Sequence, residues 1–305
     1  MNVRQIALIA FPLLILNSRP SSADDKLNVV ATTPDLASLT RSVAGERAEV
    51  TAIARPTEDP HFVDAKPSFI RLLNQADVLV EGGAQLEAGW LPPLIDGARN
   101  SRIALGAPGR IIASEGIVML DVPTRLDRSM GDVHPLGNPH YLLDPLNAKT
   151  AAATIKRGLC VVDQAHCSDY ESGLASFTAA IDTKMKEWQT ALERARGAKV
   201  VTYHKNFDYF AARFGLDVVD TLETKPGIPP SPTHLNELVP KMKMLGVRLI
   251  IVEPNRERQN SEFVAANTGA RVLLLPIMPG GKEAADYIGL IDFDVAQIAD
   301  ALKAT

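Results

Sequence analysis

The sequence predicts an α/β protein made of two lobes, each built on a parallel sheet, and joined by one long linking helix. Predicted strands alternate with predicted helices over residues 27–107, and the same alternation starts again at residue 198. Alternation of this kind is typical of βαβ units, whose strands are parallel. One long amphipathic segment separates the two runs. The length of 305 residues is also roughly twice that of a usual domain, which favours two lobes.

The first run begins with a continuous apolar segment at residues 27–31, which is the pattern of a buried strand. The helix after it starts near Pro34 and stops at Gly45, because proline suits the first helical turn and glycine suits the end. Pro67 opens a second helix in the same way. The elements predicted for this half are strand 27–31, helix 34–45, strand 48–54, helix 67–76, strand 77–83, helix 86–99 and strand 101–107.

Residues 169–197 carry an apolar stripe at three- and four-residue intervals, which indicates one side of a long helix. Gly197 is a natural stop for this helix. A helix of this length would span about 42 Å at about 1.5 Å per residue, enough to run from one lobe to the other. The stripe consists of Tyr170, Leu174, Phe177, Ile181, Met185, Trp188 and Leu192.

The second run repeats the α/β pattern with different lengths, and no internal repeat relates it to the first. The elements predicted for this half are strand 198–204, helix 207–215, strand 216–223, helix 231–246, strand 247–254, helix 260–269, strand 270–277 and helix 295–304.

The N-terminus has the three-part layout of a secretory signal peptide. Arg4 lies in a short basic start, an apolar stretch follows from Ile6 to Leu16, and small residues lead to a cleavage point after Ala23. About 11 apolar residues are too few for a membrane span, which needs about 20. No cysteine for lipid attachment lies near the cleavage point. We therefore expect a signal peptide at 1–23, a periplasmic protein, and lobes at 24–168 and 198–305 on either side of a linking helix at 169–197.

Charge and cysteine content limit the partners. The formal net charge is -4 and no run of lysine and arginine occurs, so a nucleic-acid partner is not expected.

Cys160 and Cys167 are the only cysteines. In an exported protein they favour a disulfide bond, because thiols are oxidised outside the cytoplasm. A metal site built from the two thiolates and His166 is the alternative.

Three of the six histidines occupy positions suited to binding a ligand. His61 and His204 each follow a predicted strand, and His140 lies in a loop rich in proline and glycine. Ligands gather at the carboxyl ends of parallel strands, so these side chains can converge although they are distant in sequence. Neutral imidazole is the commonest protein ligand of zinc. Pro60 and Pro139 precede two of these histidines and restrict their backbones.

The segments around these histidines resemble the three metal-binding segments of a known family: the periplasmic zinc- and manganese-binding solute-binding proteins of bacterial ABC importers, cluster A-I, zinc-binding type. The resemblance covers essentially the whole chain after residue 23 and follows the family's order. It rests on EDPHFVDAKPS, GNPHYLLDP and TYHKNFDYFAARFGL, and also on VVATTPDLASLTRSVAG, GGAQLEAGWL, IPPSPTHLNEL and IIVEP.

The resemblance implies one metal ion in a cleft between the lobes, held by His61 and His140 from the first lobe and by His204 from the second. A histidine at the third position is similar to the zinc-binding members, so Zn²⁺ is the expected cargo and Mn²⁺ the alternative. The implied partners are an inner-membrane ABC permease and a periplasmic metallochaperone, with the protein acting as a monomer.

The resemblance also implies that the protein is not an enzyme. A zinc-dependent hydrolase is the rival, because three histidines can leave an open metal position, but the sequence contains neither HExxH nor GxSxG. A surface adhesin or a metal chaperone on the same fold is a third alternative.

The sequence departs from the family at the fourth ligand. Family members place an aspartate after the last strand, where this chain has Ile277 and Met278. Water or another side chain must then complete the site. The additional metal candidates are Glu253, His134, Asp286 and Glu283, with orientation of a histidine as the competing role of Glu253. Asp59 and Asp144 are candidates to accept the second ring N–H of a histidine, and capping of a helix or turn is their alternative role.

Overall fold

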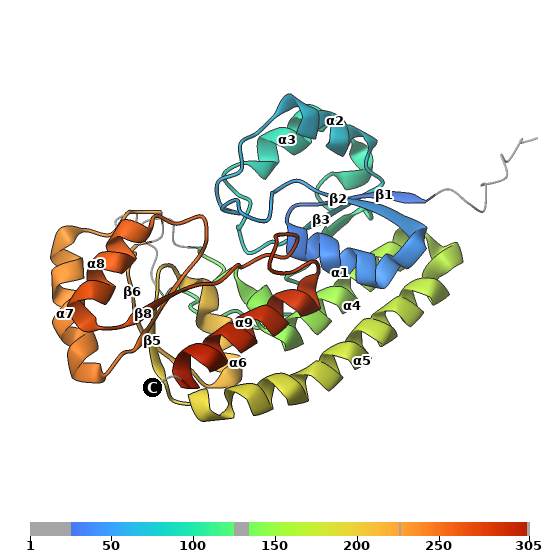
Figure 1. Cartoon of the computed structure of the whole chain (residues 1–305). Helices are drawn as coiled ribbons and strands as arrows, with labels where there is room; N and C mark the ends of the chain where they lie inside the picture. The colour runs from blue at the N-terminus through green and yellow to red at the C-terminus, as the bar shows by residue number, and fades with distance from the viewer. Residues whose placement is uncertain (1–25, 125–133, 226, 304–305) are drawn as a thin grey trace, which may run out of the picture.

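The computed structural model describes residues 26–124, 134–225 and 227–303. The predicted signal peptide at 1–23 lies outside the described residues. In the described part of the chain, the predicted architecture is confirmed: two lobes, each with a four-stranded parallel sheet, joined by a long helix (Figure 1).

The N-terminal sheet has the order β2-β1-β3-β4, with every pair parallel. One face packs Val30 and Leu79 against α2 and α3, and the opposite face packs Val29 and Val80 against α1 and α4. Figure 1 shows these two helix layers on either side of the sheet. The elements are β1 (Leu27–Ala31), α1 (Pro34–Ala44), β2 (Ala48–Ala52), α2 (Pro67–Gln75), β3 (Val78–Glu81), α3 (Leu91–Ala98), β4 (Arg110–Ile112) and α4 (Pro145–Val162).

Two elements of this half differ from the prediction. The fourth strand is β4 at Arg110–Ile112, whereas residues Ser101–Ile103 form a 3-10 turn. The reason is the side chain of Asn100, which accepts a hydrogen bond from the Arg102 N–H and donates to the carbonyls of Leu73 and Ala76. Helix α4 was not predicted. Its residues are largely alanine and polar, and its buried face becomes evident only against β4 and α5.

The C-terminal sheet repeats the arrangement with the order β6-β5-β7-β8, again all parallel. Val201 and Ile250 face α7 and α8, while Val200 and Ile251 face the core shared with the first lobe. The elements are β5 (Lys199–Thr202), α6 (Asp208–Phe214), β6 (Asp217–Thr221), α7 (Pro232–Leu245), β7 (Leu249–Val252), α8 (Arg258–Thr268), β8 (Arg271–Leu274) and α9 (Tyr287–Lys303).

Helix α5 (Cys167–Leu192) runs beneath both lobes and links them (Figure 1). Its predicted stripe is buried, with Leu174 only partly covered. The last helix, α9, returns to pack on α5 and α1, and the Trp188 indole N–H donates to Asp292 at 2.7 Å. One continuous apolar core therefore includes both sheets, α5 and α9. The boundaries 24–168, 169–197 and 198–305 stay a prediction.

The two cysteines are joined as a disulfide between the end of α4 and the start of α5. His166, in the short turn between these helices, bonds through its Nδ1 to Asp163 at 2.8 Å. The disulfide thus closes the tight connection from α4 to α5. Among the described helices, none combines the length and the apolar character needed to cross a membrane.

A buried carboxyl group in α9 makes stability depend on pH. Asp294 is fully buried, and among the described residues neither of its oxygens has a hydrogen-bond partner. Burial raises the pKa of Asp294 well above 3.8. The folded protein then keeps a proton that the unfolded chain releases above about pH 3.9, so this group destabilises the fold increasingly as pH rises toward the folded-state pKa.

We expect Asp294→Asn to unfold at nearly the same urea concentration as the wild type near pH 4 and at a higher one at pH 7. The difference in the free energy of unfolding between Asp294→Asn and the wild type should grow by up to about 1.4 kcal/mol per pH unit over this range, since asparagine mimics the protonated carboxyl group. Urea unfolding of metal-free protein at several pH values measures this. Equal stabilities of the two proteins at pH 7 would contradict it.

Candidate metal centre

Three loops at the carboxyl ends of strands carry the histidines that the sequence singled out. His61 lies between β2 and α2, His140 precedes the 3-10 turn Tyr141–Leu143, and His204 follows β5. Side chains fix two of these backbones: Asp59 accepts the His61 N–H and Asn138 accepts the His140 N–H, each at 3.0 Å. Short-range hydrogen bonds thus shape the backbone around His61 and His140.

The three imidazoles converge between the lobes. The Nε2 atoms of His61 and His140 lie 3.1 Å apart, and those of His140 and His204 lie 3.2 Å apart. One donor atom from each of the three histidines lies within 4.8 Å of the others. Four ligands at about 2.05 Å around a tetrahedral zinc ion lie about 3.3 Å from one another, so this spacing suits one ion.

The environment keeps the rings of His61 and His140 neutral. Burial is the main cause that lowers the pKa of His61 and of His140 well below 6.5, and the neighbouring imidazoles add to it. A neutral imidazole has the lone pair that a metal ion requires, whereas a protonated one does not. The rings are therefore ready to bind a cation at neutral pH.

Glu223 orients His204 and was missed by sequence reasoning. One carboxylate oxygen accepts from the His204 Nδ1 at 2.6 Å, and the other accepts the N–H of Gly227 at 2.8 Å. Both His204 and Glu223 are buried. The bond directs Nε2 toward the other histidines and increases its basicity. Its position after a predicted strand made Glu223 a possible site residue, but only the pairing of β6 with β5 shows that it reaches His204.

The structure does not bring the other carboxylate candidates into this group of donor atoms. Among the described acidic residues, none joins the three histidines as a further donor within 4.8 Å. Glu253 is fully buried and accepts a hydrogen bond from Asn206. Burial raises the pKa of Glu253. Asp286 is exposed and accepts the Gly289 N–H at the start of α9, and Glu283 is exposed.

Asp144 and His134 occupy other places around the centre. Asp144 caps α4 by accepting the Leu146 N–H and pairs with Arg213, both oxygens at 2.7 Å from the guanidinium. The ring of His134 stacks on that of His61, with centroids 4.9 Å apart and an angle of 22°. His134 therefore lies beside the three histidines, while Asp144 holds the segment that follows His140.

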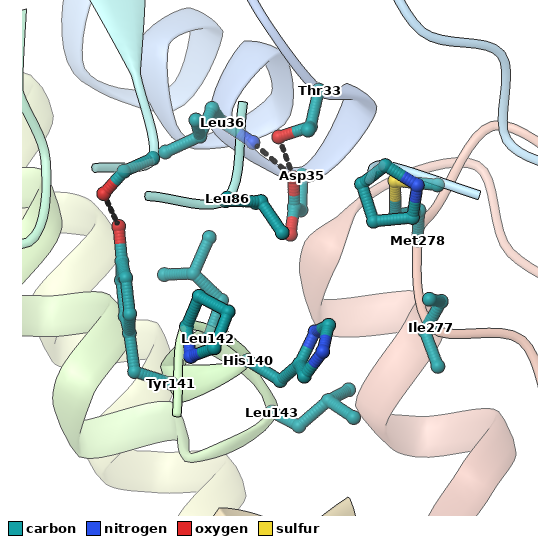
Figure 2. Close-up of a pocket in the computed structure, with 13 residues that line it drawn as sticks. Thr33, Asp35, Leu36, Leu86, His140, Tyr141, Leu142, Leu143, Ile277 and Met278 are labelled. Atoms are coloured by element: carbon teal, nitrogen blue, oxygen red, sulfur yellow. Dashed lines mark hydrogen bonds between the residues drawn. The ribbon is translucent and has the colours of Figure 1, made fainter. Parts of the chain in front are cut away.

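The place of the family's aspartate is lined by apolar side chains. Ile277 and Met278 border a cavity of about 30 Å³ together with His140 and Asp35, as Figure 2 shows. One oxygen of Asp35 accepts bonds from the Thr33 hydroxyl and the Leu36 N–H. The segment after β8 thus supplies no carboxylate here. A cavity of this size has room for about one water molecule.

A second cavity, of about 590 Å³, reaches the centre from another direction. His134, His140 and His204 line it together with Asp121 and Lys205, which form an ion pair at 2.9 Å. This cavity is much larger than a hydrated ion needs, and it gives the imidazoles of His140 and His204 an open approach.

Comparison with known proteins identifies the family. The family model described as "Zinc-uptake complex component A periplasmic" matches residues 29–301. The chain belongs to this family. Its members are metal-binding substrate-binding proteins of ABC importers, which work with a membrane permease and an ATPase. They are not enzymes, so the hydrolase alternative falls.

Individual relatives cover nearly the whole chain. The manganese ABC transporter substrate-binding lipoprotein PsaA of Streptococcus anginosus is 24% identical over 307 residues, 98% of this chain and 96% of the relative. The iron ABC transporter substrate-binding lipoprotein MtsA of Streptococcus pyogenes serotype M1 is 23% identical, covering 92% and 91%. A crystal structure of ZnuA superposes with a TM-score of 0.77 at 25% identity, covering 90% and 99%. Relatives of this kind, lipoproteins or periplasmic proteins, work outside the cytoplasm.

We expect Glu223→Gln to weaken the affinity for a divalent metal ion, with Zn²⁺ as the probe, by about 10- to 100-fold, because the amide is a poorer acceptor for the His204 Nδ1–H and lets the ring rotate. Competition with a chromogenic zinc chelator measures the affinity. Asp220→Asn is the matched control, because Asp220 lies on β6, shortly before Glu223, but pairs with Lys241. An unchanged affinity in Glu223→Gln would show that His204 needs no such support.

Proposed function

We propose that this protein captures zinc with high affinity in the periplasm and delivers it to the inner-membrane permease of an ABC importer. In this proposal residues 1–23 are a signal peptide that is removed on export. The observation that carries the proposal is a group of three imidazole donors that no carboxylate joins among the described residues. The family supports binding of a metal, and the donor set supports the choice of metal.

Donor chemistry favours zinc over manganese. Imidazole suits zinc, while manganese and other hard cations prefer carboxylate and carbonyl oxygens. The segment that follows β8 contributes Ile277 and Met278 to the surroundings of His140 and no oxygen ligand. Manganese is the second candidate, because PsaA, a relative over almost the whole chain, is named for manganese.

The proposed mechanism involves no chemistry on the ion. His61 and His140 bind it from the first lobe and His204 binds it from the second, so the ion connects the two lobes. Glu223 keeps the His204 ring in the binding orientation. We infer that the fourth position is filled by water or by His134, whose ring already lies against that of His61. We further propose that the protein acts as a monomer and receives zinc from a metallochaperone through the larger cavity.

We expect the protein lacking residues 1–23 to bind one zinc ion per chain, and His61→Ala, His140→Ala and His204→Ala each to lose at least about 100-fold in affinity. This is the order expected when one of three protein ligands is lost, since even an outer-shell change costs about 10- to 100-fold. Metal analysis after dialysis and competition with a zinc chelator give the stoichiometry and the affinity.

His166→Ala is the control for these variants, because its ring bonds Asp163 at the turn between α4 and α5. Parallel titrations with manganese decide between the two metals. Tighter binding of manganese than of zinc would overturn the proposed cargo, and full zinc affinity in any of the three histidine variants would remove that residue from the ligand set.

A further inference from the structure

An ion pair beside the metal centre joins the two lobes. The Arg256 guanidinium, in the loop after β7, contacts Asp59 in the loop after β2, with Nη2 and Oδ2 3.1 Å apart. Both side chains are mostly buried, with 18% and 15% of their area exposed. The pair thus lies in a region where solvent screens charges less than on the open surface.

Each partner of the pair is connected to one of the converging histidines. The second oxygen of Asp59 accepts the backbone N–H of His61 at 3.0 Å. The guanidinium of Arg256 lies over the ring of Tyr203, 5.4 Å from its centroid, and Tyr203 directly precedes His204. A short chain of contacts therefore runs from the backbone of His61 through the ion pair to the residue before His204.

The loop that carries His61 depends on this ion pair for its polar contact with the second lobe. In contrast, the segment around His140 has two further polar contacts with the lobe of His204. Asn138 donates to the Lys205 carbonyl at 2.8 Å, and Asp144 pairs with Arg213. Among the hydrogen bonds and ion pairs of the described residues, only the pair of Asp59 with Arg256 connects the loop between β2 and α2 to the C-terminal lobe.

The position of Arg256 is unfavourable on charge alone. A guanidinium cation near a cation site opposes binding, and Arg256 contributes to lowering the pKa of both His61 and His140. Glu253, 3.9 Å from the Arg256 Nε, and Asp59 offset this charge. Electrostatics by itself would therefore predict tighter zinc binding when Arg256 is neutralised.

We propose that Arg256 is a positioning residue for metal capture: through Asp59 it sets the place of His61 relative to His204, so that imidazoles from the two lobes meet around one ion. This inference rests on the proposed function. It assigns the pair a structural effect on the site that outweighs the repulsion between guanidinium and metal ion.

Zinc affinity of Arg256→Gln and Asp59→Asn, alone, together and in a His61→Ala background, tests the proposal. Asparagine at 59 still has an oxygen that can accept the His61 N–H, so this variant removes the ion pair specifically. We expect each single variant to bind zinc about tenfold more weakly, and the double variant to be no weaker than either. In the His61→Ala background, Arg256→Gln should change the affinity less than twofold.

Arg110→Gln is the matched control. Arg110 forms an equally buried ion pair with Glu81, but within the N-terminal lobe. The zinc affinity of Arg110→Gln should equal that of the wild type. Tighter binding in Arg256→Gln would show that charge dominates and would overturn the inference, as would a tenfold loss that persists without His61. If the wild-type protein does not bind zinc, that result would instead count against the proposed function.

A measurement on metal-free protein tests the positioning role of Arg256 independently of the proposed function. Spin labels at exposed positions 71 on α2 and 262 on α8 report the distance between the helices outside the two sheets. We expect Arg256→Gln to broaden or lengthen this distance distribution in metal-free protein, while Arg110→Gln leaves it unchanged. An unaltered distribution in Arg256→Gln would overturn the positioning role whatever metal the protein carries.

Discussion

The apolar core shared by the two lobes sets the separation of their sheets, and the metal centre depends on that separation. The inner faces of both sheets, α5 and α9 all contribute to this core. Because the histidines project from loops at strand ends on both sides, a small rotation of one lobe would move its imidazole out of bonding range. A continuous packed core resists such rotation better than a single connecting helix, since close-packed interiors transmit displacement rather than absorb it.

Two carboxylates beside this core hold the histidines by hydrogen bonds and are not in the group of donor atoms themselves. Glu223 binds the far nitrogen of His204, and Asp59 binds the backbone of His61. Neither needs to touch the ion. Their negative charge also makes a cation more favourable in a region where burial has made protonated histidines unfavourable. In the proposed centre the imidazoles therefore bind the ion, while the carboxylates hold the histidines in place and balance charge.

The segment after β8 makes the surroundings of His140 apolar on one side. Ile277 and Met278 narrow the space beside His140 to a cavity of about 30 Å³. These apolar walls offer no hard oxygen ligand from this direction, which is the basis for proposing zinc rather than manganese. Relatives named for manganese and for iron match this chain over 98% and 92% of its length, so the choice of metal does not follow from the fold alone.

Local patterns were enough to predict the two α/β lobes, the linking helix and the three histidines. These patterns are apolar runs, proline and glycine at helix ends, and motifs that resemble a family. Tertiary structure alone decided β4, α4, the bond from Glu223 to His204 and the contact of Arg256 with Asp59. Helix α4 lacks a strong apolar stripe, and its burial depends on β4 and α5. The two carboxylate contacts join residues 19 and 197 positions apart, and such partners are set by how the sheets and lobes pack, which no local pattern records.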